Sequence, residues 1–281
     1  MTEFKSDKSW VILSPIEKQI KEKIERIGTP LKEWDIRINY GIKTGFNDAF
    51  IIDGAKRKEL IEQDPKSDEI IRPLLRGRDI KRYSYEFADL YLITTFPSLK
   101  IDIELYPAIK QHLLSFGFDR LKQTGDKGAR KKTNNQWFET QDSIGYWEDF
   151  YKQKIVWKAV GKNLTFSLLE EGKFLTAPAS FITSNFNLYI LAFLQSKYGR
   201  YFIYNNSDTT GAGDIMLNIQ SLEQIPIPII DNVNSSIIQD LVYEIIQNKS
   251  NNTLNLEMQI DKNIYKLFDF DEYEIHFIDS L

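Results

Sequence analysis

The chain has 281 residues, of which 42% are hydrophobic and 13% aromatic, as in a folded protein with one good core or one domain and an appendage. It contains no cysteine and only two histidines, which excludes a disulfide framework, a thiolate zinc site, a cysteine nucleophile and a histidine-rich metal site. No apolar run is long enough to cross a membrane and the first residues, MTEFKSDKSW, are polar, so we expect a cytoplasmic chain with no membrane contact.

The formal net charge of -4 is unevenly distributed along the chain. Residues 231–281 carry ten acidic and three basic side chains, a net charge of -7, which leaves +3 for residues 1–230. Within that first part, segments 76–82 and 119–132 are locally basic. The chain is therefore expected to combine basic loops with an acidic C-terminal segment, and the basic loops are compatible with a nucleic-acid partner.

The first predicted helix begins at Ser14, because Ser14-Pro15-Ile16-Glu17 has the pattern of a capping box with proline in the first turn. It ends before Gly28-Thr29-Pro30. Residues 34–38 alternate between apolar and polar, which predicts a half-buried strand. That strand leads into a glycine-bracketed loop beginning at Gly41.

Further elements are predicted from apolar periodicity and from turn residues. They are a strand at 50–52, a helix at 57–63, a strand at 90–93, a helix at 103–116, a long exposed loop at 119–140, a strand at 154–157, a hairpin formed by 166–169 and 174–175, a helix at 187–204, an extended segment at 222–230, and amphipathic helices at 237–246 and 260–268. Residues 248–255 are expected to be a short linker. We place a domain boundary near Asp231, between a first domain of residues 1–230 and a C-terminal helical segment of residues 231–281.

The sequence contains no combination of residues that is typical of a catalytic site. The order Gly41-x-Lys-Thr-Gly differs from that of a phosphate-binding P-loop. Asp149, Glu171 and Lys173 resemble the residues of a metal-dependent nuclease, but two carboxylates and a lysine at loose spacing occur by chance in most chains. We therefore predict no catalytic residue and no metal site, and keep the nuclease as a minor alternative.

Polar and basic side chains in three segments are better explained by binding. Lys43, Thr44 and Asn47 follow or lie between glycines that allow close approach to a partner, although an ordinary hairpin tip would look the same. Arg76 and Arg78 flank Gly77 and suit bidentate contacts to guanine or phosphate; surface salt bridges are the alternative. The loop 127–137 combines cations and amides with a tryptophan, as nucleic-acid surfaces do. The candidate contacts are Lys43, Thr44, Asn47, Arg76, Arg78, Lys81, Arg82, Lys127, Arg130, Lys131, Lys132, Asn134 and Trp137.

In chain order, these segments form a recognisable series. It consists of Leu31-x-x-Trp34, GIKTGFNDAFII at 41–52, IIRPLLRGRDIKRY at 70–83, KIVW at 154–157, NLYILAFLQSKYGRYF at 187–202, QIPIP at 224–228 and IDKNIYKLFDFDEYEI at 260–275. The series resembles the TaqI-like C-terminal specificity domain. That domain is the target recognition domain of type IIG restriction-modification enzymes and related adenine-specific DNA methyltransferases, and it is similar to half of a type I specificity subunit.

The resemblance implies a mixed, sheet-containing α+β domain with peripheral helices and a C-terminal helical segment that packs on the rest of the enzyme. It implies sequence-specific recognition of double-stranded DNA without catalysis by this chain. A partner methyltransferase/endonuclease module would use S-adenosylmethionine and Mg²⁺, and no cofactor is expected here. On this view Arg76 or Arg78 reads a base edge, while Lys43 and Lys131 mainly neutralise phosphates. The alternative is a protein-interaction module that docks a partner enzyme through its acidic C-terminal helices.

Overall fold

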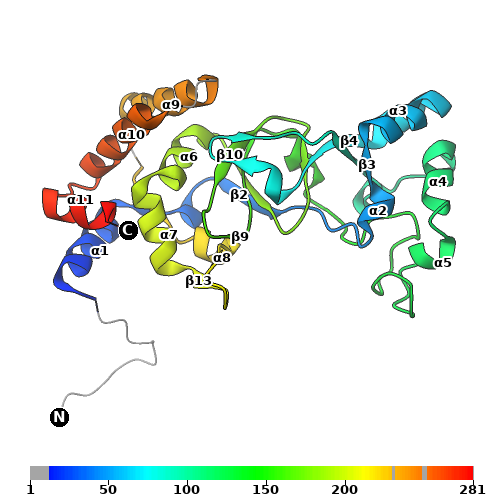
Figure 1. The fold of residues 1–281 in the computed structure, drawn as a ribbon, viewed down its shortest axis with the longest axis horizontal. Helices are drawn as coiled ribbons and strands as arrows, with labels where there is room; N and C mark the ends of the chain where they lie inside the picture. The colour runs from blue at the N-terminus through cyan, green and yellow to red at the C-terminus, as the bar shows by residue number, and fades with distance from the viewer. Residues whose placement is uncertain (1–12, 230–231, 249–251, 281) are drawn as a thin grey trace, which may run out of the picture.

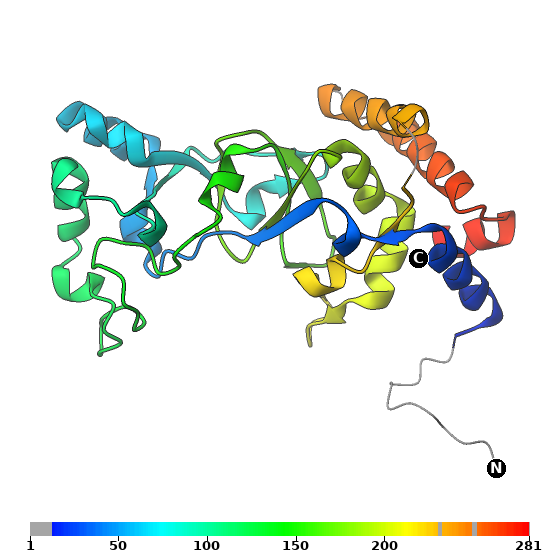
Figure 2. The same ribbon diagram turned by 180° about the vertical axis from the view of Figure 1, so that it is seen from behind.

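The computed structural model describes residues 13–229, 232–248 and 252–280. The first residues, the predicted boundary at Asp231 and residues 249–251 of the predicted linker lie outside the described residues. The molecule is elongated: a helical part containing both ends of the described chain lies at one end, strands occupy the middle, and α3, α4 and α5 lie at the other end (Figures 1 and 2). The predicted α+β class is confirmed.

The central sheet has the strand order β10-β8-β12-β2 and is antiparallel throughout. Its strands are β2 (Ile36–Tyr40), β8 (Lys154–Trp157), β10 (Phe166–Leu169) and β12 (Ser180–Ser184). Ser180 pairs with both Tyr40 and Trp157, and Trp157 also pairs with Phe166. The loops that follow β2 and β8 therefore emerge at the same end of the sheet as the loops that precede β12 and β10. Three loops thus meet there, at residues 41–47, 158–165 and 176–179.

A second sheet has the order β11-β4-β7-β3, with β11 parallel to β4 and the other pairs antiparallel. Its strands are β3 (Ile51–Asp53), β4 (Ile71–Leu75), β7 (Leu90–Ile93) and β11 (Phe174–Leu175). The predicted hairpin of 166–169 with 174–175 is wrong, because β10 and β11 belong to different sheets. Phe174 packs instead between Phe150 and Phe96, with ring centroids 4.6 and 6.1 Å away, so burial of its ring takes the chain out of the first sheet.

Helices α2 (Asn47–Phe50), α3 (Gly54–Gln63), α4 (Pro107–Leu114) and α5 (Phe118–Leu121) accompany the second sheet. Phe50, predicted in a strand, ends α2, and the strand begins one residue later. The predicted helix 103–116 is divided into a 3₁₀ turn and α4. Tyr106 precedes Pro107 and has φ -129° and ψ 65°, because the proline ring disfavours helical backbone at the residue before it.

The remaining helices are α1 (Pro15–Ile27), α6 (Asn187–Gln195), α7 (Lys197–Asn206), α8 (Ile219–Leu222), α9 (Asn232–Gln247), α10 (Leu254–Leu267) and α11 (Glu272–Asp279). The capping box of α1 is confirmed. The predicted helix 187–204 is broken at Ser196, whose extended backbone lets its hydroxyl accept the Gly199 N–H at 3.0 Å and start α7. Among the described helices, none is long and apolar enough to span a membrane.

The C-terminal helices share a core with the rest of the chain. One cluster of buried side chains joins Ile24 of α1, Leu191 of α6, Val242 of α9 and Ile264 of α10. A second cluster lies between the second sheet and α3 and α4. The predicted C-terminal helices are confirmed as α9 and α10; α9 packs against α6, and α10 packs against α9 and α7.

Short elements connect these parts. The short strands are β1 (Thr29–Pro30), β5 (Ile80–Lys81), β6 (Ser84–Tyr85), β9 (Val160–Gly161), β13 (Asp208–Thr209), β14 (Ile215–Met216) and β15 (Pro226–Ile227). The 3₁₀ turns are η1 (Leu31–Glu33), η2 (Pro65–Ile70), η3 (Gly77–Asp79), η4 (Pro97–Leu99), η5 (Ile103–Leu105) and η6 (Trp147–Tyr151). The predicted extended segment 222–230 contains β15, which pairs with β1.

Candidate nucleic-acid interface

The loop after β2 is stabilised by its own threonine. The Thr44 hydroxyl donates to Asn47 Oδ1 at 2.7 Å and accepts the Phe46 N–H at 3.1 Å, and Thr44 is fully buried. The prediction that Thr44 faces DNA is therefore wrong: its side chain closes the turn. Gly45 has φ +78°, a conformation that favours glycine. Lys43 and Asn47 are exposed, so the loop presents these two side chains to the surface.

Arg130 is a buried structural residue, although the sequence predicted a DNA contact. Its side chain is 2% exposed. Its guanidinium donates to the carbonyl oxygens of Leu121, Glu139, Trp137 and Thr44 at 2.8, 2.8, 2.7 and 3.0 Å. Burial lowers its pKa to about 10, which leaves it charged at neutral pH. Arg130 therefore fastens the 119–140 loop to the loop after β2.

The other cations of the 119–140 loop point outward. Lys127, Lys131, Lys132 and Asn134 are exposed, and none of the three lysines forms an ion pair within the described part of the chain. Trp137, a predicted contact, is half-buried between Phe118 and Phe138, with ring centroids 5.8 and 5.5 Å away. Its ring supports the loop by packing.

Arg120 was not among the predicted contacts. Its guanidinium carbon lies 4.1 Å from the centre of the Phe46 ring, and it lines a pocket together with Lys43 and Asn47. The locally basic run 119–132 was the sequence signal for it. The structure thus brings Arg120 from one basic segment to the polar loop of another.

The two arginines around Gly77 have different surroundings. Arg76 forms a bidentate pair with Asp79, with Nε and Nη2 at 2.9 and 2.8 Å from the two carboxylate oxygens. Burial acts to raise the Asp79 pKa, but the hydrogen bonds from Arg76 outweigh it and hold that pKa below its usual value. Arg76 thus stabilises the turn, as the salt-bridge alternative predicts. Arg78 is exposed and forms no ion pair among the described residues, although its charge also helps to lower the Asp79 pKa.

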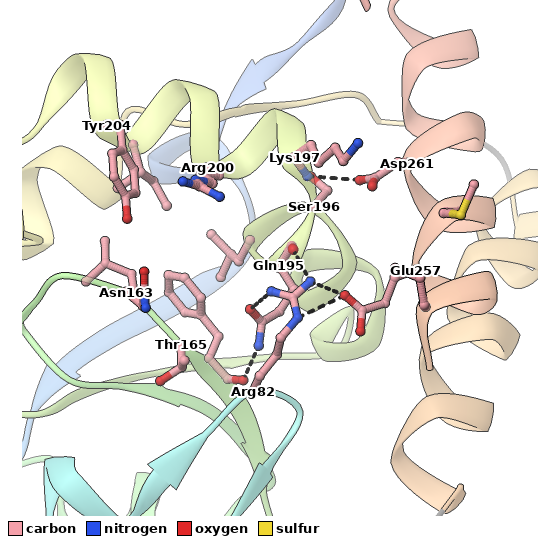
Figure 3. Close-up of a pocket in the computed structure, with 16 residues that line it drawn as sticks. Arg82, Asn163, Thr165, Gln195, Ser196, Lys197, Arg200, Tyr204, Glu257 and Asp261 are labelled. Carbon is pink, nitrogen blue, oxygen red and sulfur yellow. Dashed lines mark hydrogen bonds and ion pairs between the residues drawn. The ribbon is translucent and has the colours of Figure 1, made fainter. Parts of the chain in front are cut away.

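Lys81 and Arg82 are engaged with other parts of the protein. Lys81 pairs with Glu86 at 3.4 Å. Arg82 donates from Nη1 and Nη2 to the side-chain and backbone oxygens of Gln195 at 2.9 and 2.8 Å, and from Nε to Glu257 at 2.9 Å (Figure 3). Arg82 therefore links the β5–β6 turn to α6 and α10. Arg82 is exposed, so its predicted contact with DNA stays a prediction, and the structure shows its guanidinium engaged within the protein.

Two of the three residues of the nuclease alternative, Asp149 and Lys173, are engaged with other side chains, and the third, Glu171, is exposed. Asp149 is buried and accepts hydrogen bonds from Asn39 and Lys152 at 2.9 and 2.7 Å. Lys173 pairs with Glu170 at 2.8 Å. Within the residues that the structure describes, no group of three or more His, Cys, Asp or Glu side chains is placed to hold a metal ion.

Two of the exposed candidates, Lys43 and Arg78, lie at or beside the end of the central sheet where three loops converge. The Gly41 N–H donates to the Ala179 carbonyl at 2.8 Å, and the Ala177 N–H donates to the Ile42 carbonyl at 3.1 Å. A Cβ atom placed on Gly77 would lie 3.6 Å from Ala179 Cβ and 3.3 Å from Lys158 Cβ. Lys43 and Arg78 are therefore on neighbouring segments, separated by the 176–179 loop. Arg130 and the Gln141 N–H, which donates to the Thr44 carbonyl at 3.1 Å, attach the 119–140 loop beside them.

A comparison with protein-family models identifies the family of this chain. The sequence model of the TaqI-like C-terminal specificity domain matches residues 72–227, more than half of the chain. The chain belongs to this family. The match begins just before the turn that carries Arg78 and ends at β15, so it includes three strands of the central sheet. The resemblance seen in the sequence is thereby confirmed.

Two solved structures are similar to this chain, and the first of them supports the fold. The type IIL restriction-modification enzyme MmeI in complex with DNA superposes with a TM-score of 0.60 at 13% identity, over 90% of this chain and 37% of that one. The type IIG restriction endonuclease BpuSI gives a TM-score of 0.49 at 15% identity, over 91% of this chain and 33% of that one. The chain thus spans about a third of each enzyme's length. No curated protein matches the sequence.

Proposed function

We propose that this chain is the DNA target recognition part of a restriction-modification system and binds double-stranded DNA sequence-specifically. The observation that carries the proposal is that Lys43 and Arg78, both exposed and without an ion pair among the described residues, lie on neighbouring segments at one end of the central sheet. Lys43, Arg78 and the lysines at 131 and 132 come from three separate segments, joined by backbone hydrogen bonds and by Arg130. A phosphate backbone is the partner that such a surface fits. Family membership supports the same role.

Individual roles follow from side-chain chemistry. Arg78 has a free guanidinium on a turn held by Arg76 and Asp79, which suits a bidentate contact to a guanine edge worth about 1–3 kcal/mol of discrimination. Lys43, Lys131 and Lys132 are flexible point charges and would neutralise phosphates. Asn47 would donate its amide N–H to a base or a phosphate, because its Oδ1 already accepts the Thr44 hydroxyl.

Catalysis is assigned to partner modules. The enzymes that share this fold are about three times as long as the aligned region, which leaves room in them for other domains. A methyltransferase/endonuclease module of the same system would bind S-adenosylmethionine and Mg²⁺, extrude the target base and carry out the chemistry. This chain would position that module on its site and would need no cofactor of its own.

Charge reversal at two lysines tests the proposal. Lys131→Glu/Lys132→Glu is expected to weaken duplex binding by at least about tenfold at low salt, and to reduce the slope of log K against log salt by roughly two. The measurement is a fluorescence anisotropy titration at several salt concentrations. The matched control is Lys18→Glu/Lys58→Glu, which changes two exposed lysines on α1 and α3 that are not part of the candidate DNA-binding surface. Equal effects of the two variants would contradict a localised DNA site.

A partner-docking role is the second candidate. Large apolar side chains are exposed along the C-terminal helices, a segment in which acidic residues outnumber basic ones; they are Ile237, Tyr243, Leu254, Met258 and Tyr273. Such residues are typical of helix faces that pack on another protein. If docking is the whole function, Lys131→Glu/Lys132→Glu leaves partner binding intact and the wild-type chain binds no duplex. If the chain does both, only DNA binding is lost.

A further inference from the structure

A series of cations continues beyond Arg78, away from the loops already described. Lys158, Lys162 and Arg200 lie on segments that contact one another, and we call these three residues the basic track. None of them was among the residues predicted from the sequence to contact DNA. They come from the loop after β8 and from α7, which are far apart in the chain.

Lys158 connects the track to the candidate interface. It is the first residue after β8, at the sheet end where the loops converge. Its Cβ lies next to Gly77, the neighbour of Arg78. Its ammonium group extends over Gly161: a Cβ atom placed on Gly161 would lie 2.9 Å from Lys158 Nζ. Both glycines thus leave space for the lysine side chain, which carries positive charge from Arg78 toward residue 162.

Tyr204 contacts both the backbone of Lys162 and the side chain of Arg200. Its hydroxyl donates to the Lys162 carbonyl at 2.6 Å, and the Arg200 guanidinium carbon lies 5.3 Å from the centre of its ring. Arg200 and Tyr204 lie on the same side of a cavity of about 590 Å³, with Asn163 and Thr165 on the other side (Figure 3). Lys162 and Arg200 are both exposed. The track therefore runs along the surface from the end of the sheet to α7.

The basic track differs from nearby cations in being unneutralised. Around the same cavity, Arg82 pairs with Glu257, and Lys197 pairs with Asp279 at 2.8 Å. Among the described residues, no carboxylate lies within ion-pair distance of Lys158, Lys162 or Arg200; this includes Asp208 and Asp214 in the adjoining β13–β14 hairpin. Three cations without an ion pair, on adjacent segments that begin next to the turn of Arg78, give a surface that attracts a polyanion.

We propose that the basic track binds backbone phosphates of duplex DNA outside the recognised bases, and so extends the footprint toward α7. This inference rests on the proposed function, because the track continues the same surface. Lysines and an arginine without a base-reading loop contribute affinity that is independent of sequence and sensitive to salt. The track would therefore position the duplex, while the loops around Lys43 and Arg78 read it.

The test uses the triple variant Lys158→Gln/Lys162→Gln/Arg200→Gln on the full chain. The probes are a mixed-sequence duplex pool and short and long versions of a duplex selected on the wild-type chain. We expect the salt slope of the long duplex to fall by roughly one for each lost contact, with a smaller change for the short duplex. Lys18→Gln/Lys21→Gln/Lys58→Gln is the matched control, and the conservative Lys158→Arg/Lys162→Arg/Arg200→Lys should restore binding.

Several outcomes would overturn the inference. One is that the triple variant, with unchanged thermal unfolding, binds both duplexes with the wild-type slope while Lys43→Gln/Arg78→Gln weakens binding. In that case the basic track does not bind phosphates, and the proposed function of the chain is unaffected. Equal loss for short and long duplexes, or tighter binding of single strands than of duplexes, would also contradict a flanking contact. If the wild-type chain binds no duplex at low salt, the proposed function itself fails.

Discussion

Replacing Arg130 with methionine is expected to lower the free energy of unfolding by about 3–5 kcal/mol, the largest loss from a single side chain in this region. Four carbonyl oxygens accept from its guanidinium. The Thr44 carbonyl would keep the Gln141 N–H and the Glu139 carbonyl would keep the Gln123 side chain. The carbonyls of Leu121 and Trp137 have no such second partner among the described residues. Two buried acceptors would therefore be left unsatisfied.

Thermal unfolding and hydrogen exchange measure this effect. The melting temperature should fall by roughly 10 °C, and amide protection should be lost first in residues 119–142. The matched control is Lys131→Met, in which the adjacent exposed lysine is changed and the unfolding free energy should stay within about 0.5 kcal/mol of wild type. If Arg130→Met is as mild as the control while its DNA binding becomes less salt-dependent, Arg130 is a surface contact and its structural role is refuted.

Replacing Lys154 with methionine is expected to change how stability depends on pH. Lys154 is fully buried in β8, and its ammonium donates to the carbonyls of Lys152 and Glu170 at 2.7 and 3.2 Å. Burial lowers its pKa to about 7; the nearby Glu170 and Glu171 carboxylates act against that shift and Lys173 adds to it. In the unfolded chain the pKa returns to its ordinary value near 10.5. At a pH between about 7 and 10.5, Lys154 is therefore protonated in the unfolded chain and largely neutral in the folded one.

The direction in which stability changes with pH follows from the proton that Lys154 binds in the unfolded chain. Wild-type stability should rise with pH above about 7, by up to about 1.4 kcal/mol per pH unit from this group, and the full penalty of a buried charge applies below that pH. Lys154→Met removes this slope, so the variant should gain relative to wild type at pH 6. It should lose at pH 9, because two carbonyls lack their donor. Urea unfolding across this range checks the crossing, with Lys127→Met as the exposed control. Parallel curves for wild type and Lys154→Met would refute the lowered pKa.

Local signals in the sequence predicted much of the fold. The capping box at Ser14, the strand at 154–157 and the amphipathic C-terminal helices depend on nearby residues, and the structure has them. The hairpin at 166–175 was wrong because strand pairing is a long-range choice. Phe174 is drawn into the second sheet by aromatic partners distant in the sequence. The break at Ser196 was missed because apolar periodicity continues through it.

The candidate site shows a similar division. Residue type marked segments in which Lys43, Arg78 and the lysines at 131 and 132 are exposed, and their contact with DNA stays a prediction. Residue type could not say which polar side chains fold inward. The Thr44 hydroxyl accepts the Phe46 N–H, and the Arg130 guanidinium donates to the Thr44 carbonyl, 86 residues away in the sequence. Arg82 donates to Glu257, which is 175 residues away. Lys158 was missed because only tertiary packing shows that it lies beside Gly77.

The central claim is that this chain reads duplex DNA through the surface around Lys43 and Arg78. Selection of bound duplexes from a random-sequence library, followed by titration of the selected duplex at low and high salt, tests it most directly. We predict enrichment of one defined sequence, and in Arg78→Ala a loss of about 1–3 kcal/mol of discrimination at one base pair with little change elsewhere. A wild-type chain that binds no duplex at low salt, or binds all sequences equally at every salt concentration, would contradict the claim.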